Sequence, residues 1–167
     1  FLIIGGSTGV GKSQLLNNMA IQVWMQGNSI YTPTEEFTKG YNVLYFSLEM
    51  PFVGCFTRTL ARLADVPFYS IRDATLLPDQ EKRLFEHALG FSARYPYRFD
   101  ICDIARGVTI EQIERIYNRV CQEYIPDVIV IDYLGLMDHE VTDLDDWLKL
   151  GKISEKFQEF IRINKKV

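Results

Sequence analysis

Short apolar runs alternate along this chain with segments whose apolar residues recur at helical spacing. Four strands are expected: the apolar runs at residues 1–4, 43–48 and 128–131, and the segment 97–102, in which Arg98 and Asp100 alternate with apolar residues. Runs that are apolar throughout are typical of parallel strands covered by helices on both faces. The pattern therefore predicts an α/β fold with a mainly parallel sheet.

Five helices are expected between and after these strands. Proline suits the first turn of a helix, so Pro51 and Pro78 each indicate a helix start. Thr109 and Gln112 have the spacing of a capping box, which marks a third start. Helical spacing predicts that Phe85 faces the core. The helices are predicted at residues 12–25, from Pro51, from Pro78, after Thr109 and at 147–163, and the polar stretches 27–41 and 138–146 are expected to be loops.

The composition is that of one ordinary globular domain. Of the 167 residues, 47% are hydrophobic and 24% are charged, and the formal net charge of -4 gives no bulk indication of nucleic-acid binding. The three cysteines form no CxxC pair, so buried or half-buried thiols in a reducing, cytoplasmic compartment are expected. No apolar run reaches membrane-spanning length. Because the chain opens inside an apolar run, it is expected to be part of a longer polypeptide.

The clearest chemical signal is a glycine-rich sequence between the first strand and the first helix. Residues 6–13 read GSTGVGKS and fit the phosphate-loop pattern G-x-x-x-x-G-K-[ST]. A glycine-rich turn with a coincidental lysine could look the same, but the flanking strand and helix favour the phosphate loop. Lys12 would bring positive charge to the β- and γ-phosphates, and Ser13 would offer a hydroxyl to Mg²⁺. Phosphate contacts are thus predicted for Gly6, Ser7, Thr8, Gly9, Val10, Gly11, Lys12 and Ser13.

A second signal is the carboxylate at the end of the fourth expected strand. Residues 128–132 read VIVID, the Walker B pattern, in which Asp132 would hold Mg²⁺ directly or through water. Ligands of open α/β sheets bind at the carboxyl edge of the strands, where Asp132 would lie. A strand that happens to end in aspartate is common, so the prediction depends on the phosphate loop that accompanies it.

A carboxylate that orients the attacking water is the remaining requirement for hydrolysis. Many P-loop ATPases carry a glutamate directly after the Walker B aspartate, but Tyr133 stands there. Glu49 follows the second strand at the same edge of the sheet. On spacing alone, a catalytic glutamate and a glutamate that caps the helix after Pro51 are equally good interpretations.

Four sequence stretches together resemble one family. They are GSTGVGKS at 6–13, YFSLEMP at 45–51, FTRTLARL at 56–63 and VIVIDYLGLM at 128–137. In order and spacing they resemble the RecA-like C-terminal ATPase domain of DnaB-type replicative helicases, including bacteriophage versions. The resemblance covers nearly all of residues 1–167 and implies a three-layer α/β sandwich that is incomplete at its C-terminal end.

The resemblance also implies roles for the matching residues. Lys12 and Ser13 would bind ATP and Mg²⁺, Glu49 would be the catalytic glutamate and Asp132 the Walker B aspartate. Arg58 matches a family arginine and would contact the nucleotide or support Glu49, although a surface salt bridge is an equal alternative. The family implies ATP-driven movement on single-stranded DNA as a ring of six subunits, with primase and a helicase loader as partners.

Two departures and two alternatives accompany the resemblance. The chain ends before the family's phosphate-sensing glutamine, arginine finger and main DNA-binding loop. The loop at 138–146 is acidic and would be a poor contact for a phosphate backbone. The alternatives are a RecA- or KaiC-like ATPase that does not unwind DNA, and a non-catalytic module that uses nucleotide only to assemble a ring.

Overall fold

The computed structural model of the 167-residue chain describes every residue except 8, 26–40, 91–96, 139–144 and 165–167. Thr8 and most of the two expected loops, 27–41 and 138–146, therefore lie outside the described residues.

Three parallel strands form the sheet. They are β1 (Val43–Ser47), β2 (Phe99–Asp103) and β3 (Val128–Asp132), in the order β2-β1-β3. The central strand β1 is buried along its whole length, as expected for an apolar strand with a neighbour on each side and helices on both faces. The predicted parallel sheet is confirmed.

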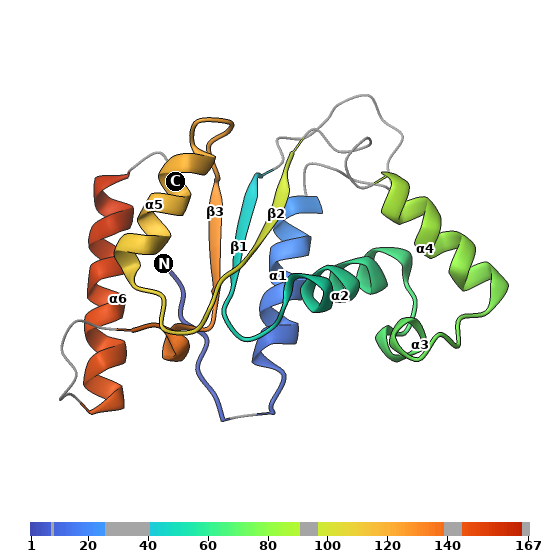
Figure 1. The fold of residues 1–167 in the computed structure, drawn as a ribbon, viewed down its shortest axis with the longest axis horizontal. Helices are drawn as coiled ribbons and strands as arrows, with labels where there is room; N and C mark the ends of the chain where they lie inside the picture. Colours follow the sequence, from blue (N-terminus) through green and yellow to red (C-terminus); the bar gives the residue numbers. More distant parts are fainter. Residues whose placement is uncertain (8, 26–40, 91–96, 139–144, 165–167) are drawn as a thin grey trace.

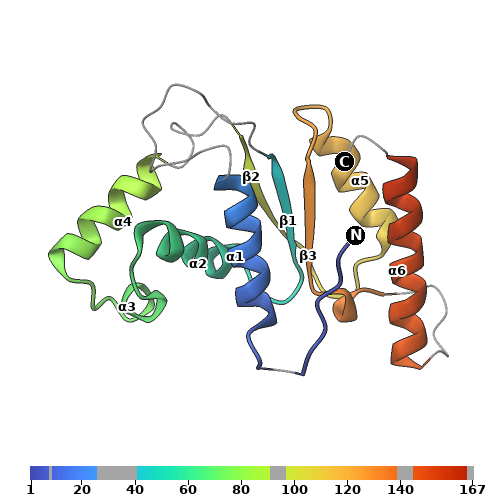
Figure 2. The same cartoon turned by 180° about the vertical axis from the view of Figure 1, so that it is seen from behind.

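Helices cover both faces of this sheet (Figures 1 and 2). On one face lie α1 (Lys12–Met25) and α2 (Phe52–Ala64), and on the other lie α5 (Ile110–Val120) and α6 (Asp146–Ile163). The predicted capping box begins α5, where the Gln112 side chain accepts a hydrogen bond of 2.9 Å from the Thr109 N–H. The three-layer sandwich expected from the sequence is confirmed.

Alternate residues of β1 divide the core into two parts. Leu44 and Phe46 pack with α5 and α6, whereas Val43 and Tyr45 pack with α1 and α2. Trp24 of α1, which is fully buried, meets the ring of Phe99 edge-on at 5.7 Å on this second side. The side chain of Tyr45 therefore belongs to the α1 and α2 side of the sheet.

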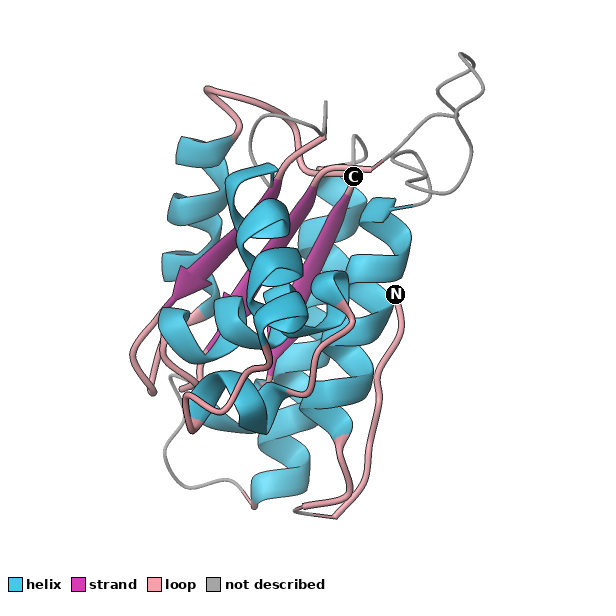
Figure 3. Cartoon of the chain, turned by 90° about the vertical axis from the view of Figure 1, so that its right-hand side faces the viewer, coloured by secondary structure: helices cyan, strands magenta, loops and turns pink. Residues whose placement is uncertain are grey.

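The expected strand at residues 1–4 is wrong. The segment is a loop (Figure 3) that lies on the β3 side of the sheet (Figures 1 and 2), and Phe1, Leu2 and Ile3 are 63%, 69% and 54% exposed. An apolar run becomes a strand only when its N–H and C=O groups pair with a neighbour in a ladder. The described sheet consists of β1, β2 and β3 alone, so the run at 1–4 has no such pairing.

A small group of helices extends from the end of α2. The short α3 (Phe68–Arg72), which the sequence analysis did not predict, and α4 (Pro78–Gly90) pack with α2 around Ala61, Ala64 and Val66. The prediction that Phe85 of α4 faces the core is wrong, because this side chain is 63% exposed. Helical spacing identifies an apolar stripe but does not say whether another element covers it.

Candidate functional site

The loop at residues 6–13 meets the carboxyl ends of the strands at one edge of the sheet (the lower edge in Figure 1). Helix α1 begins there at Lys12, β1 ends at Ser47, and β3 ends at Asp132. The short 3₁₀ helix η1 (Leu134–Leu136), which follows β3, lies at the same edge. The fold thus brings together the segments that carry most of the predicted site residues, which are up to 126 positions apart in the sequence (132 minus 6).

Two glycines of the glycine-rich loop adopt a backbone that suits the predicted phosphate loop. Gly9 and Gly11 have φ angles of 82° and 87°, in the left-handed region that other residues rarely adopt. The Lys12 ammonium folds back over the loop and donates hydrogen bonds to the carbonyl oxygens of Gly6 at 2.8 Å and Ser7 at 2.6 Å. Its charge therefore lies at the loop, beside the N-terminus of α1, where backbone N–H groups favour an anion.

Asp132 receives a hydrogen bond on each of its two carboxylate oxygens. The Ser13 hydroxyl donates to Oδ1 at 3.0 Å, and the Tyr45 hydroxyl donates to Oδ2 at 3.0 Å. Asp132 is only 2% exposed. The predicted pair of Ser13 and Asp132 is in contact, although 119 positions separate the two residues in the sequence.

The tyrosine in this group keeps its proton. Burial raises the pKa of Tyr45 far above its ordinary value, and the nearby charge of Asp132 and the hydrogen bond to it raise it further. The hydroxyl is therefore a permanent donor to Asp132. The peptide bond that follows Asp132 is cis.

Glu49 lies in a turn that is tied to the end of β1 and to β3. The Ser47 hydroxyl donates to the Met50 carbonyl oxygen at 2.6 Å, and the Leu48 N–H donates to the Asp132 carbonyl oxygen at 2.8 Å. The Glu49 side chain between these anchors is exposed. The structure thus puts Glu49 at the predicted edge and leaves its carboxylate accessible to a ligand.

Buried polar contacts connect this turn to α2 and α1. The Cys55 thiol donates to the Ser47 hydroxyl at 3.1 Å, and burial raises the pKa of this thiol, which keeps it protonated. One turn later, Thr59 accepts a hydrogen bond of 3.2 Å from the side-chain amide of Asn17, which follows Ser13 on α1 by one turn. Helix α2 therefore holds the Glu49 turn and the phosphate-loop helix in a fixed relation.

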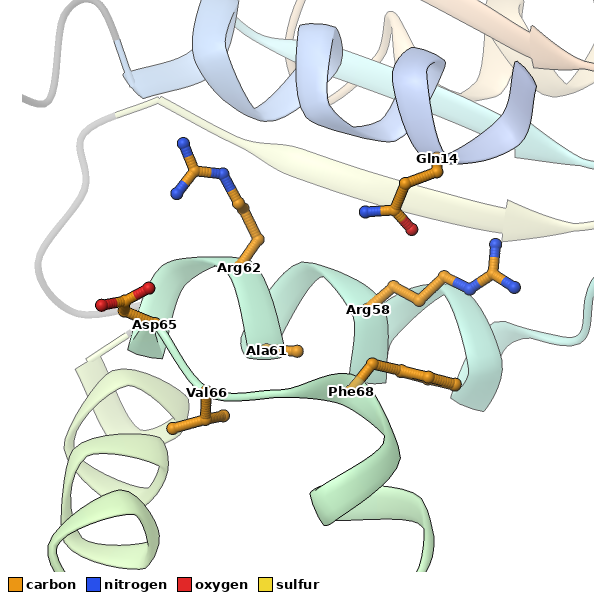
Figure 4. Close-up of a pocket in the computed structure, with 7 residues that line it drawn as sticks. All are labelled: Gln14, Arg58, Ala61, Arg62, Asp65, Val66 and Phe68. Carbon is orange, nitrogen blue, oxygen red and sulfur yellow. The ribbon is translucent and has the colours of Figure 1, made fainter. Parts of the chain in front are cut away.

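Arg58 lies on α2, beside a shallow pocket rather than in the group around Asp132. Its guanidinium lies over the ring of Phe68, 5.4 Å from the ring centroid. The pocket, of about 190 Å³, is also lined by Gln14 of α1 and by Arg62 (Figure 4). A nucleotide contact from Arg58 stays a prediction.

The sequence analysis missed Tyr45 as a member of the site. The signal was present, since Tyr45 precedes Ser47 by two positions and so lies on the same face of β1. Predicting that Tyr45 belongs to the site would have required knowing that Ser47 lies opposite Asp132 in the pairing of β1 with β3. Only the order of the strands in the sheet supplies that information.

The parallel sheet with helices on both faces, and the glycine-rich loop that leads into α1 at its carboxyl edge, define this chain as a RecA-like P-loop domain. The family model for the DnaB-like helicase C terminal domain matches residues 1–164, and the chain belongs to this family.

One solved structure that matches is described as a DnaB-like replicative helicase and its interactions with primase. It is 18% identical in sequence, has a TM-score of 0.64, and the match covers 88% of this chain but only 33% of that chain. This similarity supports the fold. Among curated proteins, no match to the chain is found.

Proposed function

We propose that this chain binds ATP with Mg²⁺ and hydrolyses it as part of the motor domain of a replicative DNA helicase. The observation that carries the proposal is the hydrogen bond between the Ser13 hydroxyl and the buried Asp132 carboxylate, next to a lysine folded over a glycine-rich loop. If these residues only stabilised the fold, a hydroxyl, a buried carboxylate and a lysine would not need to lie together at the carboxyl edge of a parallel sheet.

The donor set fits Mg²⁺. Ser13 and Asp132 supply hard oxygen atoms, and Mg²⁺ in nucleotide sites is held by one or two protein oxygens together with phosphates and water. Within the described residues there is no cluster of three or more His, Cys, Asp or Glu side chains that could bind a metal without the nucleotide. Mg²⁺, when bound, neutralises charge on the phosphate oxygens during transfer.

Each residue of the proposed site has a distinct task. Lys12 would exchange the carbonyl oxygens of Gly6 and Ser7 for β- and γ-phosphate oxygens, which carry full charge and are therefore stronger acceptors. The backbone of the loop, including Gly9, Val10, Gly11 and the neighbouring Thr8, would surround the phosphates. Glu49 would accept a proton from the attacking water, and Arg58 would contact the nucleotide or support Glu49.

The wider activity of the protein is proposed from the family. The chain spans about a third of the length of the helicase structure that it matches. Movement along single-stranded DNA, a ring of six subunits, and contacts with primase and a helicase loader would involve regions outside these residues.

No helix in the described part of the chain is long and apolar enough to cross a membrane. We propose that the protein works in the cytoplasm of a bacterium or a phage-infected cell.

A strand-displacement assay on the full-length natural protein tests the helicase proposal. With ATP and Mg²⁺, the protein is expected to release the labelled strand from a forked duplex, whereas ADP or the omission of Mg²⁺ should give no release. ATP turnover without any strand release would favour the RecA- or KaiC-like alternative instead.

A further inference from the structure

The side chain of Tyr45 is fully buried and its hydroxyl forms a hydrogen bond with a residue of the proposed site. It is 1% exposed, and its ring stacks against Phe99 at a centroid distance of 6.5 Å. Neighbouring core positions on these strands, such as Phe46 and Phe99, carry phenylalanine. A buried tyrosine hydroxyl has to find a partner, and that of Tyr45 has Asp132.

The register of the sheet explains why these two side chains meet. Tyr45 pairs with Val130 and Ser47 pairs with Asp132, so Tyr45 and Asp132 are diagonal neighbours on one face of β1 and β3. The ring is held by packing on the α1 and α2 side of the sheet. The hydroxyl is thus brought to Oδ2 by a fully buried side chain of the central strand.

The two hydrogen bonds to Asp132 are accepted by different oxygens of its carboxylate. Ser13, which is itself a proposed ligand of Mg²⁺, bonds to Oδ1, and Tyr45 bonds to Oδ2 on the other side. The Tyr45 contact would not have to break if Ser13 and Asp132 held a metal ion, because Ser13 and Tyr45 bond to different oxygens of the carboxylate. It therefore can hold the carboxylate in one orientation both with and without the metal ion.

We propose that Tyr45 is a positioning residue for the metal site, because its hydroxyl fixes the orientation of the Asp132 carboxylate that receives Mg²⁺. This inference rests on the proposed function. Groups that orient metal ligands change metal affinity or activity by about 10- to 100-fold when they are removed. Tyr45 would act through Asp132 and would touch neither ATP nor the metal.

The test is the Tyr45→Phe variant of the full-length natural protein, which keeps the ring and removes only the hydroxyl. The Mg²⁺ concentration for half-maximal ATP turnover is expected to rise about 10-fold. Saturating Mg²⁺ should restore most of the turnover. The affinity for ATP in EDTA, measured by isothermal titration calorimetry, should remain within about 2-fold of that of the unchanged protein, because the phosphate loop is intact.

Tyr124→Phe is a matched control. The Tyr124 hydroxyl donates to Asp100 at 2.8 Å, which makes a second Tyr–Asp hydrogen bond, near the start of β2 and away from the carboxyl edge. This variant should lose comparable thermal stability and leave the Mg²⁺ dependence unchanged.

Three results would count against the inference, and they differ from one another. An unchanged Mg²⁺ dependence in Tyr45→Phe would overturn it, and so would a parallel loss of ATP affinity in EDTA, which would reveal a general packing role. If the unchanged protein bound no ATP at any Mg²⁺ concentration, the proposed function itself would fail. Calorimetric unfolding of each variant establishes that the comparison concerns folded protein.

Discussion

Replacing Lys12 with alanine is expected to weaken ATP binding about 10- to 100-fold and to reduce turnover by at least about 100-fold. A hydrogen bond from a charged group contributes about 1.5–3 kcal/mol, and about 1.4 kcal/mol corresponds to a factor of ten in affinity. The larger loss in turnover follows because positive charge aimed at the transferred phosphoryl group is worth most in the transition state. Equilibrium titration with a fluorescent ATP analogue and steady-state kinetics measure the two effects.

The fold should survive this substitution. Among the described residues, the hydrogen bonds of the Lys12 ammonium go to exposed backbone carbonyls of its own loop, at Gly6 and Ser7, and those groups can turn to water. Lys82→Ala, on the exposed surface of α4, removes a lysine far along the chain from the site and should leave binding and turnover unchanged. ATP affinity that is indifferent to Lys12 would mean that residues 6–13 are a structural turn.

Replacing Glu49 with glutamine is expected to separate turnover from binding. Glutamine has nearly the same shape but cannot accept the proton of the attacking water, and general-base catalysis contributes about 10²- to 10⁴-fold. Turnover should therefore fall by about that factor, while the affinity for ATP and Mg²⁺ stays close to that of the unchanged protein. Single-turnover quench-flow kinetics isolates the chemical step.

The same variant decides between the two interpretations of Glu49. A glutamate that only capped α2 would be dispensable for chemistry, and the structure identifies Pro51 as the N-cap residue of that helix, without a side-chain capping bond. Glu86→Gln on α4, also an exposed glutamate, is the matched control and should retain full turnover. Unimpaired turnover in Glu49→Gln would show that Glu49 is not the catalytic base. Ring formation with ATP but without turnover, unaffected by Glu49→Gln, would favour the non-catalytic assembly module.

Much of the site was predictable because its chemistry is local in the sequence. The predicted phosphate loop combines Gly9 and Gly11, which have positive φ angles, with a lysine and a hydroxyl within eight consecutive residues, and such a set can be recognised without a structure. The positions of Asp132 and Glu49 at the sheet edge were predictable for a related reason, although only the family resemblance favoured Glu49 as the catalytic glutamate. Each follows an apolar strand, and parallel strands end at a common edge.

The remaining features depend on pairing between distant segments. The run at 1–4 is as apolar as a buried strand, but whether it enters a sheet depends on a ladder partner and not on its own composition. Phe85 has helical spacing, yet its burial depends on what α4 packs against. The contact of Tyr45 with Asp132 depends on the order β2-β1-β3, which no local pattern specifies.

The central claim is that this site is the ATPase of a motor that moves on DNA, and ATP turnover by the full-length natural protein with and without single-stranded DNA tests it most directly. We expect Mg²⁺-dependent turnover that rises several-fold when single-stranded DNA is added and that falls by at least about 100-fold in the Lys12→Ala and Glu49→Gln variants. ATP binding without turnover, or turnover that is indifferent to DNA and to Glu49, would contradict the account.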